Sequence, residues 1–270
     1  MAKQGFIGSY IQNFDDALGG GIPRDHIVLV YGAAGTMKST LCFNVLYNEV
    51  LSGKKSVYIS IEQSSLSLLK QMVKMGFDIS KVNIEVLNDA DDVIKGLSRL
   101  KDDEEKKLTI IDFGTIRKQL RPAKGAKNKF GMSGDMVESI LTMVQTLAKK
   151  KLCDIVVLDS MTALYSLTEL KEPRSEIFYL FEFFRDLGIT SFIISEESQE
   201  HTKYSRFGIE SYLVDGIVHI MLTERNRKVT REIQIRKMRA TDCTNDIYTL
   251  EFDSKTKKFK ALYGGKMPLV

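Results

Sequence analysis

One short stretch of this sequence has the residue types and the spacing that bind phosphate. It follows an apolar segment, residues 27–31, and leads into a segment of helical periodicity that begins near Ser39. Small residues in such a turn let successive backbone N–H groups point inward, and the start of the helix adds its positive dipole end. The sequence therefore predicts a phosphate-binding loop made of Gly32, Ala33, Ala34, Gly35, Thr36, Met37, Lys38, Ser39 and Thr40.

Two side chains of this loop have specific chemistry. Lys38 would reach the β- and γ-phosphates of a nucleotide, and the hydroxyl of Ser39 would bind Mg²⁺. The usual pattern has Gly directly before the Lys, whereas Met37 stands there in this chain. A glycine-rich turn that merely caps a helix is the alternative interpretation.

Carboxylates follow two further apolar segments. Asp159 ends the segment 154–158, where it could hold a Mg²⁺-bound water, or it could be an ordinary turn aspartate. Glu62 follows the segment 56–61 and is the candidate general base, with a surface glutamate in a turn as the alternative. The neighbouring Gln63 could align a water molecule but cannot accept its proton.

Apolar segments of strand length alternate with longer segments of helical periodicity along most of the chain. The expected strands are 27–31, 56–61, 108–113, 154–158 and 190–195, and the expected helices are 39–51, 64–75, 135–150 and 176–187. Strands of this composition predict a mostly parallel sheet with helices on both faces. After residue 215 the pattern alternates more clearly, which predicts antiparallel strands that extend the sheet at 217–222, 229–238 and 247–252. We expect one α/β domain over residues 1–270.

Two segments interrupt this order. The mixed charge run 101–107 is interpreted as a solvated turn. The segment 117–129 has six basic residues and no periodicity, so we interpret it as a mobile surface loop that could also touch an anionic partner.

The composition favours some classes of protein over others. The formal net charge of +4 gives no strong reason to expect nucleic acid or an anionic membrane as partner. The three cysteines and three histidines have no metal-ligand spacing, which argues against a zinc site or a disulfide framework. No segment is typical of a signal peptide or a membrane span, so a soluble, cytoplasmic protein is expected.

Several segments resemble a known family of ATPases. The residues 14–23, FDDALGGGIP, are similar to the segment "LD-x-L-x-GGIP" that precedes the first strand in KaiC-like and RadA-like ATPases. Further segments that resemble KaiC proteins are 58–64, 158–164, 192–198, 207–210 and 213–218. The resemblance implies a RecA-like P-loop NTPase core, ATP as the nucleotide and Mg²⁺ as the metal. It also implies that Glu62 is the first of two adjacent glutamates, the second replaced by Gln63, and that Glu196 lies near the γ-phosphate.

The segment 235–239, IRKMR, resembles the family signature "KMRG", with Ala240 in place of the Gly. In that family the Lys and the Arg reach the γ-phosphate of a neighbouring subunit. The resemblance thus implies that Lys237 and Arg239 act in trans and that the protein forms a homo-oligomeric ring, with a hexamer favoured. Basic residues on the outer face of a strand are the alternative.

The chain resembles the single-domain KaiC-like proteins of archaea, which implies a slow ATPase in a regulatory or signalling role with an unknown protein partner. One alternative is a RadA/RadB-like ATPase that binds DNA through residues 117–129 and 200–206. Another is an ATP-sensing scaffold that does not hydrolyse its nucleotide. Some family members phosphorylate themselves, and Ser211 stands near the corresponding position, although Tyr212 replaces its companion.

Overall fold

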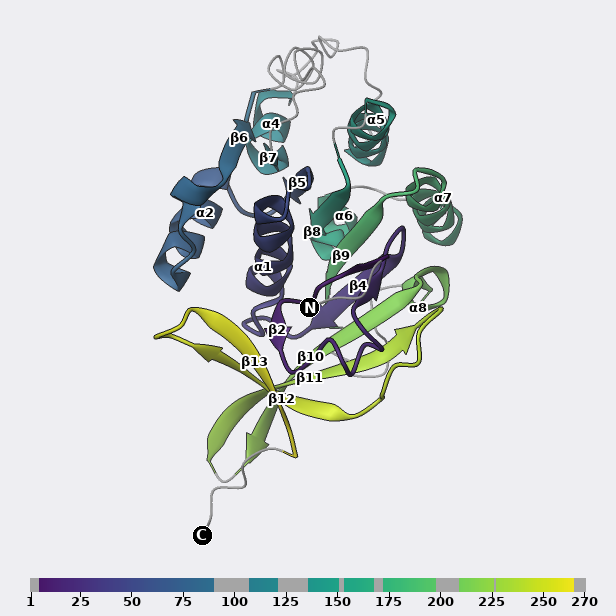
Figure 1. The fold of residues 1–270 in the computed structure, drawn as a ribbon. Coiled ribbons are helices and arrows are strands. Elements are labelled where there is room, and N and C mark those ends of the chain that lie inside the picture. Colours follow the sequence, from purple (N-terminus) through teal and green to yellow (C-terminus); the bar gives the residue numbers. More distant parts are fainter. Residues whose placement is uncertain are drawn as a thin grey trace.

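A large central sheet dominates the computed structural model, which describes residues 5–89, 107–120, 136–150, 153–167, 172–197, 209–225 and 227–264. Within these ranges the sheet has 11 strands and helices on both of its faces (Figure 1). This is the α/β architecture that the sequence predicts.

The elements follow one another as the apolar pattern indicates, with several short additions. The strands are β1 (Phe6–Ile7), β2 (Ile11–Gln12), β3 (Ile22–Pro23), β4 (Ile27–Gly32), β5 (Ser56–Ser60), β6 (Asn83–Leu87), β7 (Lys107–Asp112), β8 (Ile155–Asp159), β9 (Thr190–Glu196), β10 (Gly216–Arg225), β11 (Lys228–Met238), β12 (Ile247–Asp253) and β13 (Lys258–Tyr263). The helices are α1 (Lys38–Leu51), α2 (Ser65–Met75), α4 (Phe113–Leu120), α5 (Met136–Lys149), α6 (Met161–Leu167), α7 (Pro173–Asp186) and α8 (Glu210–Leu213), with a short 3₁₀ helix at Ile79–Lys81. Among the described residues, no helix is long and apolar enough to cross a membrane.

The strand that leads into the predicted phosphate loop, β4, lies in the middle of the sheet. The strand order is β2-β13-β12-β11-β10-β4-β9-β8-β5-β7-β6. The strands from β4 to β6 in this order are all parallel. Parallel strands end at the same edge, so the residues that follow β4, β5, β8 and β9 are brought together there.

Two apolar cores lie on opposite faces of the sheet. Helices α1 and α2 cover one face, where Phe43 and Leu68 pack among buried strand residues (Figure 1). Helices α5, α6 and α7 cover the other face and contribute Val144 and Phe181. All six residues of β4 are buried, as expected for a parallel strand with helices on both sides.

The strands after residue 215 extend the sheet, as predicted, but not all of their pairing is antiparallel. β11 is antiparallel to β10 and to β12, whereas β10 is parallel to β4. The chain reaches β10 after α8 at the edge where β4 begins, and the backbone N–H of Asp215 donates to the carbonyl of Ile27 there. β10 therefore runs in the same direction as β4. A further strand that was not predicted, β13, is antiparallel to β12.

Two interpretations of charged segments need correction. Residues 117–120, assigned to a mobile loop, form the end of α4. Lys107, assigned to a solvated turn, begins β7 and forms an ion pair with Glu85 at 2.7 Å. The apolar residues before residue 117 belong to α4, and those after residue 107 belong to β7. Each of these elements continues into the neighbouring charged segment. Residues 101–106 and 121–129 lie outside the described part of the chain.

Asp112 joins two helix starts to the end of β7. Its Oδ2 atom accepts hydrogen bonds from the backbone N–H of Ser65 at 2.8 Å and from the hydroxyl of Ser65 at 3.1 Å. Its Oδ1 atom accepts from the backbone N–H of Thr115 at 2.9 Å. Because Asp112 is only 2% exposed, removal of its carboxylate would leave the buried N–H of Ser65 and the partly buried N–H of Thr115 without this acceptor.

We therefore expect Asp112→Ala to lower the free energy of unfolding by about 2–3 kcal/mol. Urea denaturation of the purified protein measures this loss. The matched control is Asp78→Ala, which removes the exposed carboxylate that accepts from Ser80 at the start of the 3₁₀ helix and should cost clearly less than Asp112→Ala, because water can replace an exposed acceptor. Equal losses in the two variants would contradict the role given to Asp112.

Candidate functional site

The predicted phosphate loop curls between β4 and α1. At Gly32, an added Cβ atom would lie 2.0 Å from the carbonyl oxygen of Ile220, so the strand next to the loop leaves no space for a side chain. Gly35 has φ 80° and Met37 has φ 73°, both in the left-handed region. These backbone angles bend the chain sharply before α1 begins at Lys38.

The start of α1 offers its backbone N–H groups to the loop. The residue that precedes the helix, Met37, makes no side-chain capping bond, and the first turn has no acidic residue. By contrast, the side chain of Ser64 caps α2 by accepting from the backbone N–H of Ser67. An uncapped start of a 14-residue helix after a small-residue loop is suited to an anion with several oxygens, such as a phosphate chain.

Lys38 lies at the centre of this loop and is 7% exposed. Its ammonium group donates to the carbonyls of Gly32 and Ala33, each at 2.8 Å. Burial lowers the pKa of Lys38, and the nearby carboxylates of Glu196, Asp159 and Glu62 oppose that shift. The loop thus holds a cation against its own backbone, in a position to meet phosphate oxygens.

Met37 occupies the position at which phosphate loops usually have Gly. A left-handed conformation favours Gly, and it costs other L-residues about 1–2 kcal/mol. The partly buried side chain of Met37 packs against the core on the α1 face and also lines the pocket described below. The loop keeps its shape with Met37, and a thioether flanks the phosphate position.

Asp159 ends β8 and faces the same space. The phenol of Tyr58 donates to its Oδ2 atom at 2.5 Å. Burial raises the pKa of Asp159, while hydrogen bonds with Tyr58 and Ser39 oppose that shift. Ser39 and Asp159 therefore lie side by side, as the predicted Mg²⁺ site requires.

Glu62 follows β5 and reaches the same pocket, although β8 and β9 separate β5 from β4 in the sheet. Its Oε1 atom accepts a hydrogen bond of 2.7 Å from the hydroxyl of Ser160. That hydroxyl in turn accepts from the backbone N–H of Ala163 at 3.1 Å. Ser160 thus orients Glu62, a contact that the sequence analysis did not anticipate.

Gln63 does not share the position of Glu62. Its amide group donates to the hydroxyl of Ser67 at 2.9 Å and to Oε1 of Gln71 at 3.2 Å, both on α2. The water-aligning position considered for Gln63 is therefore not supported by its contacts in this structure.

Glu196 ends β9 and pairs in the sheet with Gly32, the first residue of the loop. Its backbone N–H donates to the hydroxyl of Thr162 at 2.9 Å, which fixes the end of the strand. Its carboxylate is near enough to Lys38 to oppose the lowering of the lysine pKa. Glu196 and Lys38 thus line the same cavity.

These residues line one cavity of about 790 Å³. The sequence-predicted residues among its walls are Ala34, Gly35, Met37, Lys38, Ser39, Thr40, Glu62, Asp159 and Glu196. Unpredicted residues from α2, β11 and β12 extend the cavity, among them Gln71, Met75, Val229, Thr230, Arg231, Thr249, Leu250, Glu251 and Phe252. The volume and the mixed polar and apolar walls suit a nucleotide.

Arg231 is a cation of the cavity wall that was not predicted from the sequence. It lies on β11 opposite Leu222, beyond the level at which β4 ends. Its Nε atom donates to the carbonyl of Gly35 at 3.3 Å, so a second cation borders the loop. The alternating pattern of β11 indicated a strand but not which end of it would meet the phosphate loop.

Lys237 and Arg239 do not line the cavity of their own chain. They come at the end of β11, at the edge of the sheet where β4 and β10 begin. β4 has six residues, so its two ends lie about 16 Å apart. The two predicted γ-phosphate contacts are thus at the opposite edge from the loop.

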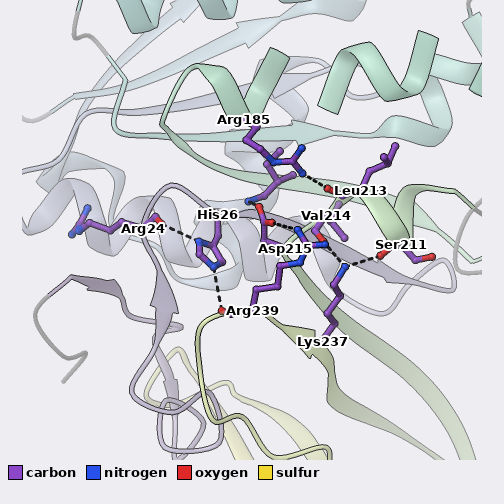
Figure 2. Close-up of polar contacts among 10 residues, drawn as sticks. Arg24, His26, Arg185, Ser211, Leu213, Val214, Asp215, Lys237 and Arg239 are labelled. Carbon is purple, nitrogen blue, oxygen red and sulfur yellow. Dashed lines mark hydrogen bonds and ion pairs between the residues drawn. The ribbon is translucent and has the colours of Figure 1, made fainter. Parts of the chain in front are cut away.

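Figure 2 shows how these two cations are held. The ammonium group of Lys237 donates to the carbonyls of Ser211 at 3.1 Å and Val214 at 2.7 Å. Arg239 forms an ion pair with Asp215 at 2.9 Å, and 53% of its side chain is exposed. Burial lowers the pKa of Lys237, and the positive charge of Arg239 lowers it further.

Arg185 adds a third cation to this edge, as Figure 2 also shows. Its guanidinium group donates to the carbonyl of Leu213 at 2.5 Å. Asp215 accepts from the backbone N–H of Ile27 as well as from Arg239. Of the three cations, Arg239 is paired with the carboxylate of Asp215, whereas Lys237 and Arg185 are held by backbone carbonyls.

The other predicted functional residues and segments have no contact with the cavity in the described part of the chain. Ser211 lies in α8, and its carbonyl is one of the two that bind Lys237. Among residues 5–89, 107–120, 136–150, 153–167, 172–197, 209–225 and 227–264, no three His, Cys, Asp or Glu residues form a metal-binding group. Residues 121–129 and 200–206, considered for DNA contacts, lie outside the described ranges.

The donor set of the cavity fits a nucleotide with Mg²⁺. The uncapped start of α1 and Lys38 provide positive charge for phosphates, and a hydroxyl and a carboxylate are the oxygen ligands that Mg²⁺ prefers. Mg²⁺ keeps several waters and phosphate oxygens as ligands, so it needs few protein side chains.

Comparison with known proteins agrees with this geometry. The family model described as "ATPase: KaiC" matches residues 7–260. The chain is 29% identical over 240 residues to a UPF0273 protein of Sulfurisphaera tokodaii, a match that covers 86% of this chain and 74% of that protein. It is 25% identical over 233 residues to the circadian clock protein KaiC3 of Synechocystis sp., covering 86% of this chain but 41% of the clock protein.

A solved structure supports the fold. The KaiC-like protein PH0186 from Pyrococcus horikoshii OT3 superposes with a TM-score of 0.69 at 22% identity, over 95% of this chain and 98% of that one. Together with the family model, which spans almost the whole chain, the phosphate loop and its carboxylates lead to one conclusion. The chain belongs to the KaiC family of P-loop ATPases and has the RecA-like fold.

Proposed function

We propose that residues 1–270 form one RecA-like domain that binds ATP with Mg²⁺ and hydrolyses it slowly, as part of a homo-oligomeric ring with a regulatory or signalling role. One observation supports the proposal most. Lys38, at the uncapped start of α1, shares a single cavity with Glu62, Asp159 and Glu196. This set combines phosphate binding with carboxylates that can hold a metal and accept a proton.

The phosphate end of the nucleotide would lie against the loop. The backbone N–H groups of residues 33–40 and the ammonium group of Lys38 would bind the β- and γ-phosphates. Ser39 and Asp159 would hold Mg²⁺, which neutralises charge on the phosphates when it is bound. Arg231 and Glu196 would border the terminal phosphate from either side.

The hydrolytic step requires a group that accepts a proton from the attacking water. Glu62 is that group in our proposal, because Ser160 fixes one of its oxygens and leaves the other for the water. The nucleoside would occupy the part of the cavity between α2 and the strands β11 and β12, where Met75, Val229 and Phe252 provide apolar surface.

Ring assembly would complete the site. Lys237 and Arg239 lie about the length of β4 away from their own loop, so a neighbour that docks head to tail could bring its cations to this cavity. Cations at the terminal phosphate stabilise charge that develops in the transition state. We propose a hexamer, which the family resemblance favours.

The second candidate is a scaffold that senses ATP without hydrolysing it. The contacts of Gln63 favour it, because this side chain is bound to α2 and leaves Glu62 as the single acidic residue of the family's usual pair. Release of inorganic phosphate from Mg²⁺·ATP by the wild-type protein separates the two candidates.

Two substitutions test the roles at the loop. Lys38→Ala removes the cation that meets the phosphates, so we expect ATP binding and hydrolysis to disappear together. Glu62→Gln keeps an acceptor for Ser160 but cannot take a proton, so binding should persist while hydrolysis falls by about 10²–10⁴-fold. Calorimetry with Mg²⁺·ATP and an assay of phosphate release measure the two properties.

The matched control is Glu172→Gln, which makes the same change at the start of α7, away from the cavity. It should leave binding and hydrolysis as in the wild type. If Lys38→Ala and Glu62→Gln both keep wild-type rates, the assignment of the site is wrong.

Mixed oligomers test the contact across subunits. We expect Glu62→Gln and Lys237→Ala subunits to be inactive when each is assayed alone. In a one-to-one mixture, a Lys237→Ala subunit keeps Glu62 and can receive Lys237 from a Glu62→Gln neighbour, so about one quarter of the sites should be restored. Phosphate release from the mixture measures the recovery, and native mass spectrometry verifies that mixed oligomers have formed. Mixed oligomers without recovered activity would show that Lys237 does not act on a neighbour's site.

A further inference from the structure

A tyrosine lies beneath the proposed metal site. Tyr58 is on β5, on the sheet face that α1 covers, and it is 0% exposed. Its ring packs near that of Phe43 on α1, with centroids 6.2 Å apart. The apolar core thus fixes the ring, while the hydroxyl at its tip reaches Asp159, which lines the cavity.

This hydroxyl hydrogen-bonds with Asp159, and it also has a side-chain hydrogen bond with Ser39. The phenol donates to Oδ2 of Asp159 at 2.5 Å, and Asp159 itself lines the cavity. A hydrogen bond to a carboxylate is stronger than one between neutral groups. The bond therefore joins a rigid core residue to a functional residue at the end of a strand.

This contact restricts the orientation of the carboxylate. The terminal torsion of an aspartate is broad, so the plane of its carboxyl group is not fixed by the backbone alone. A bond from the buried phenol to Oδ2 limits that rotation, and Ser39, the other proposed Mg²⁺ ligand, also hydrogen-bonds this carboxylate. A site that binds a metal through fixed ligands loses less freedom when the metal enters.

We propose that Tyr58 is a positioning residue for the metal site, holding Asp159 in the orientation in which its carboxylate meets Mg²⁺ of the bound nucleotide. This inference rests on the proposed Mg²⁺·ATP function. It assigns to a residue of the apolar core a role in metal affinity, in addition to any role in packing.

Another buried tyrosine provides a matched comparison. Tyr47, on α1, donates its hydroxyl to the backbone carbonyl of Asp78 at 2.9 Å and does not line the cavity. Tyr47→Phe and Tyr58→Phe each remove one hydroxyl and keep the ring. A purely structural role predicts similar behaviour of the two variants toward nucleotide.

Calorimetry of ATP binding, once with Mg²⁺ and once with EDTA, tests the proposal. The measured quantity is the gain in affinity that Mg²⁺ provides. We expect Tyr58→Phe to reduce this gain about tenfold, as for the loss of one charge-assisted hydrogen bond, while its affinity for ATP in EDTA stays at the wild-type value. Tyr47→Phe should leave both affinities unchanged.

A double substitution shows whether the effect passes through Asp159. In an Asp159→Asn background, the change Tyr58→Phe should produce little further loss of the Mg²⁺-dependent gain. The proposal is overturned if Tyr58→Phe keeps the wild-type gain, if it weakens binding equally with Mg²⁺ and with EDTA, or if its effect in the Asp159→Asn background is undiminished.

Two further measurements distinguish failure of the proposed function from failure of the role given to Tyr58. A wild-type protein that binds no ATP under either condition would contradict the proposed function, and with it the metal role of Tyr58. If Tyr58→Phe does not fold, a protein labelled with fluorotyrosine serves instead. The ¹⁹F resonance of Tyr58 should then shift when Mg²⁺ is added to the ATP complex, while that of Tyr47 should not; an unchanged Tyr58 resonance would overturn the proposal.

Discussion

The uncapped start of α1 is the feature on which the site depends. A helix begins with backbone N–H groups that need acceptors, and in many helices a side chain provides one, as Ser64 does for α2. At α1 the preceding residue is Met37, whose side chain packs against the core and makes no capping bond. The donors therefore face the cavity, where Lys38 adds a full charge to their partial ones.

The direction of the strands determines what can join this helix start. Parallel strands bring Glu62, Asp159 and Glu196 to the edge at which β4 ends, although they are far apart in the sequence. The antiparallel β11 differs, because one of its ends carries Arg231 beside the loop and the other leads to Lys237 at the opposite edge. A head-to-tail neighbour can bring such opposite edges together, whereas a two-fold symmetric dimer pairs identical surfaces.

The sequence predicted those parts of the fold and site that depend on local pattern. The phosphate loop and the carboxylates after β5 and β8 follow from apolar strands that end in characteristic residues, and the structure places them in one cavity. Arg231 and Tyr58 could not be predicted in the same way, because their contacts depend on strand pairing and on side-chain direction across the sheet. The parallel pairing of β10 with β4 was not predicted for a related reason, since an alternating apolar pattern does not indicate the direction of a strand.

Met37 shows how a motif can change while its geometry is kept. The left-handed conformation costs an L-residue about 1–2 kcal/mol relative to Gly, and full burial of a methionine side chain returns about 1.5–3 kcal/mol. The partial burial of Met37 is thus of the right size to offset the strain. Since the N–H groups that bind phosphate belong to the backbone, the loop can tolerate this residue without losing its donors. What Met37 changes is the wall of the cavity, which gains a flexible apolar side chain in place of the hydrogen of a glycine.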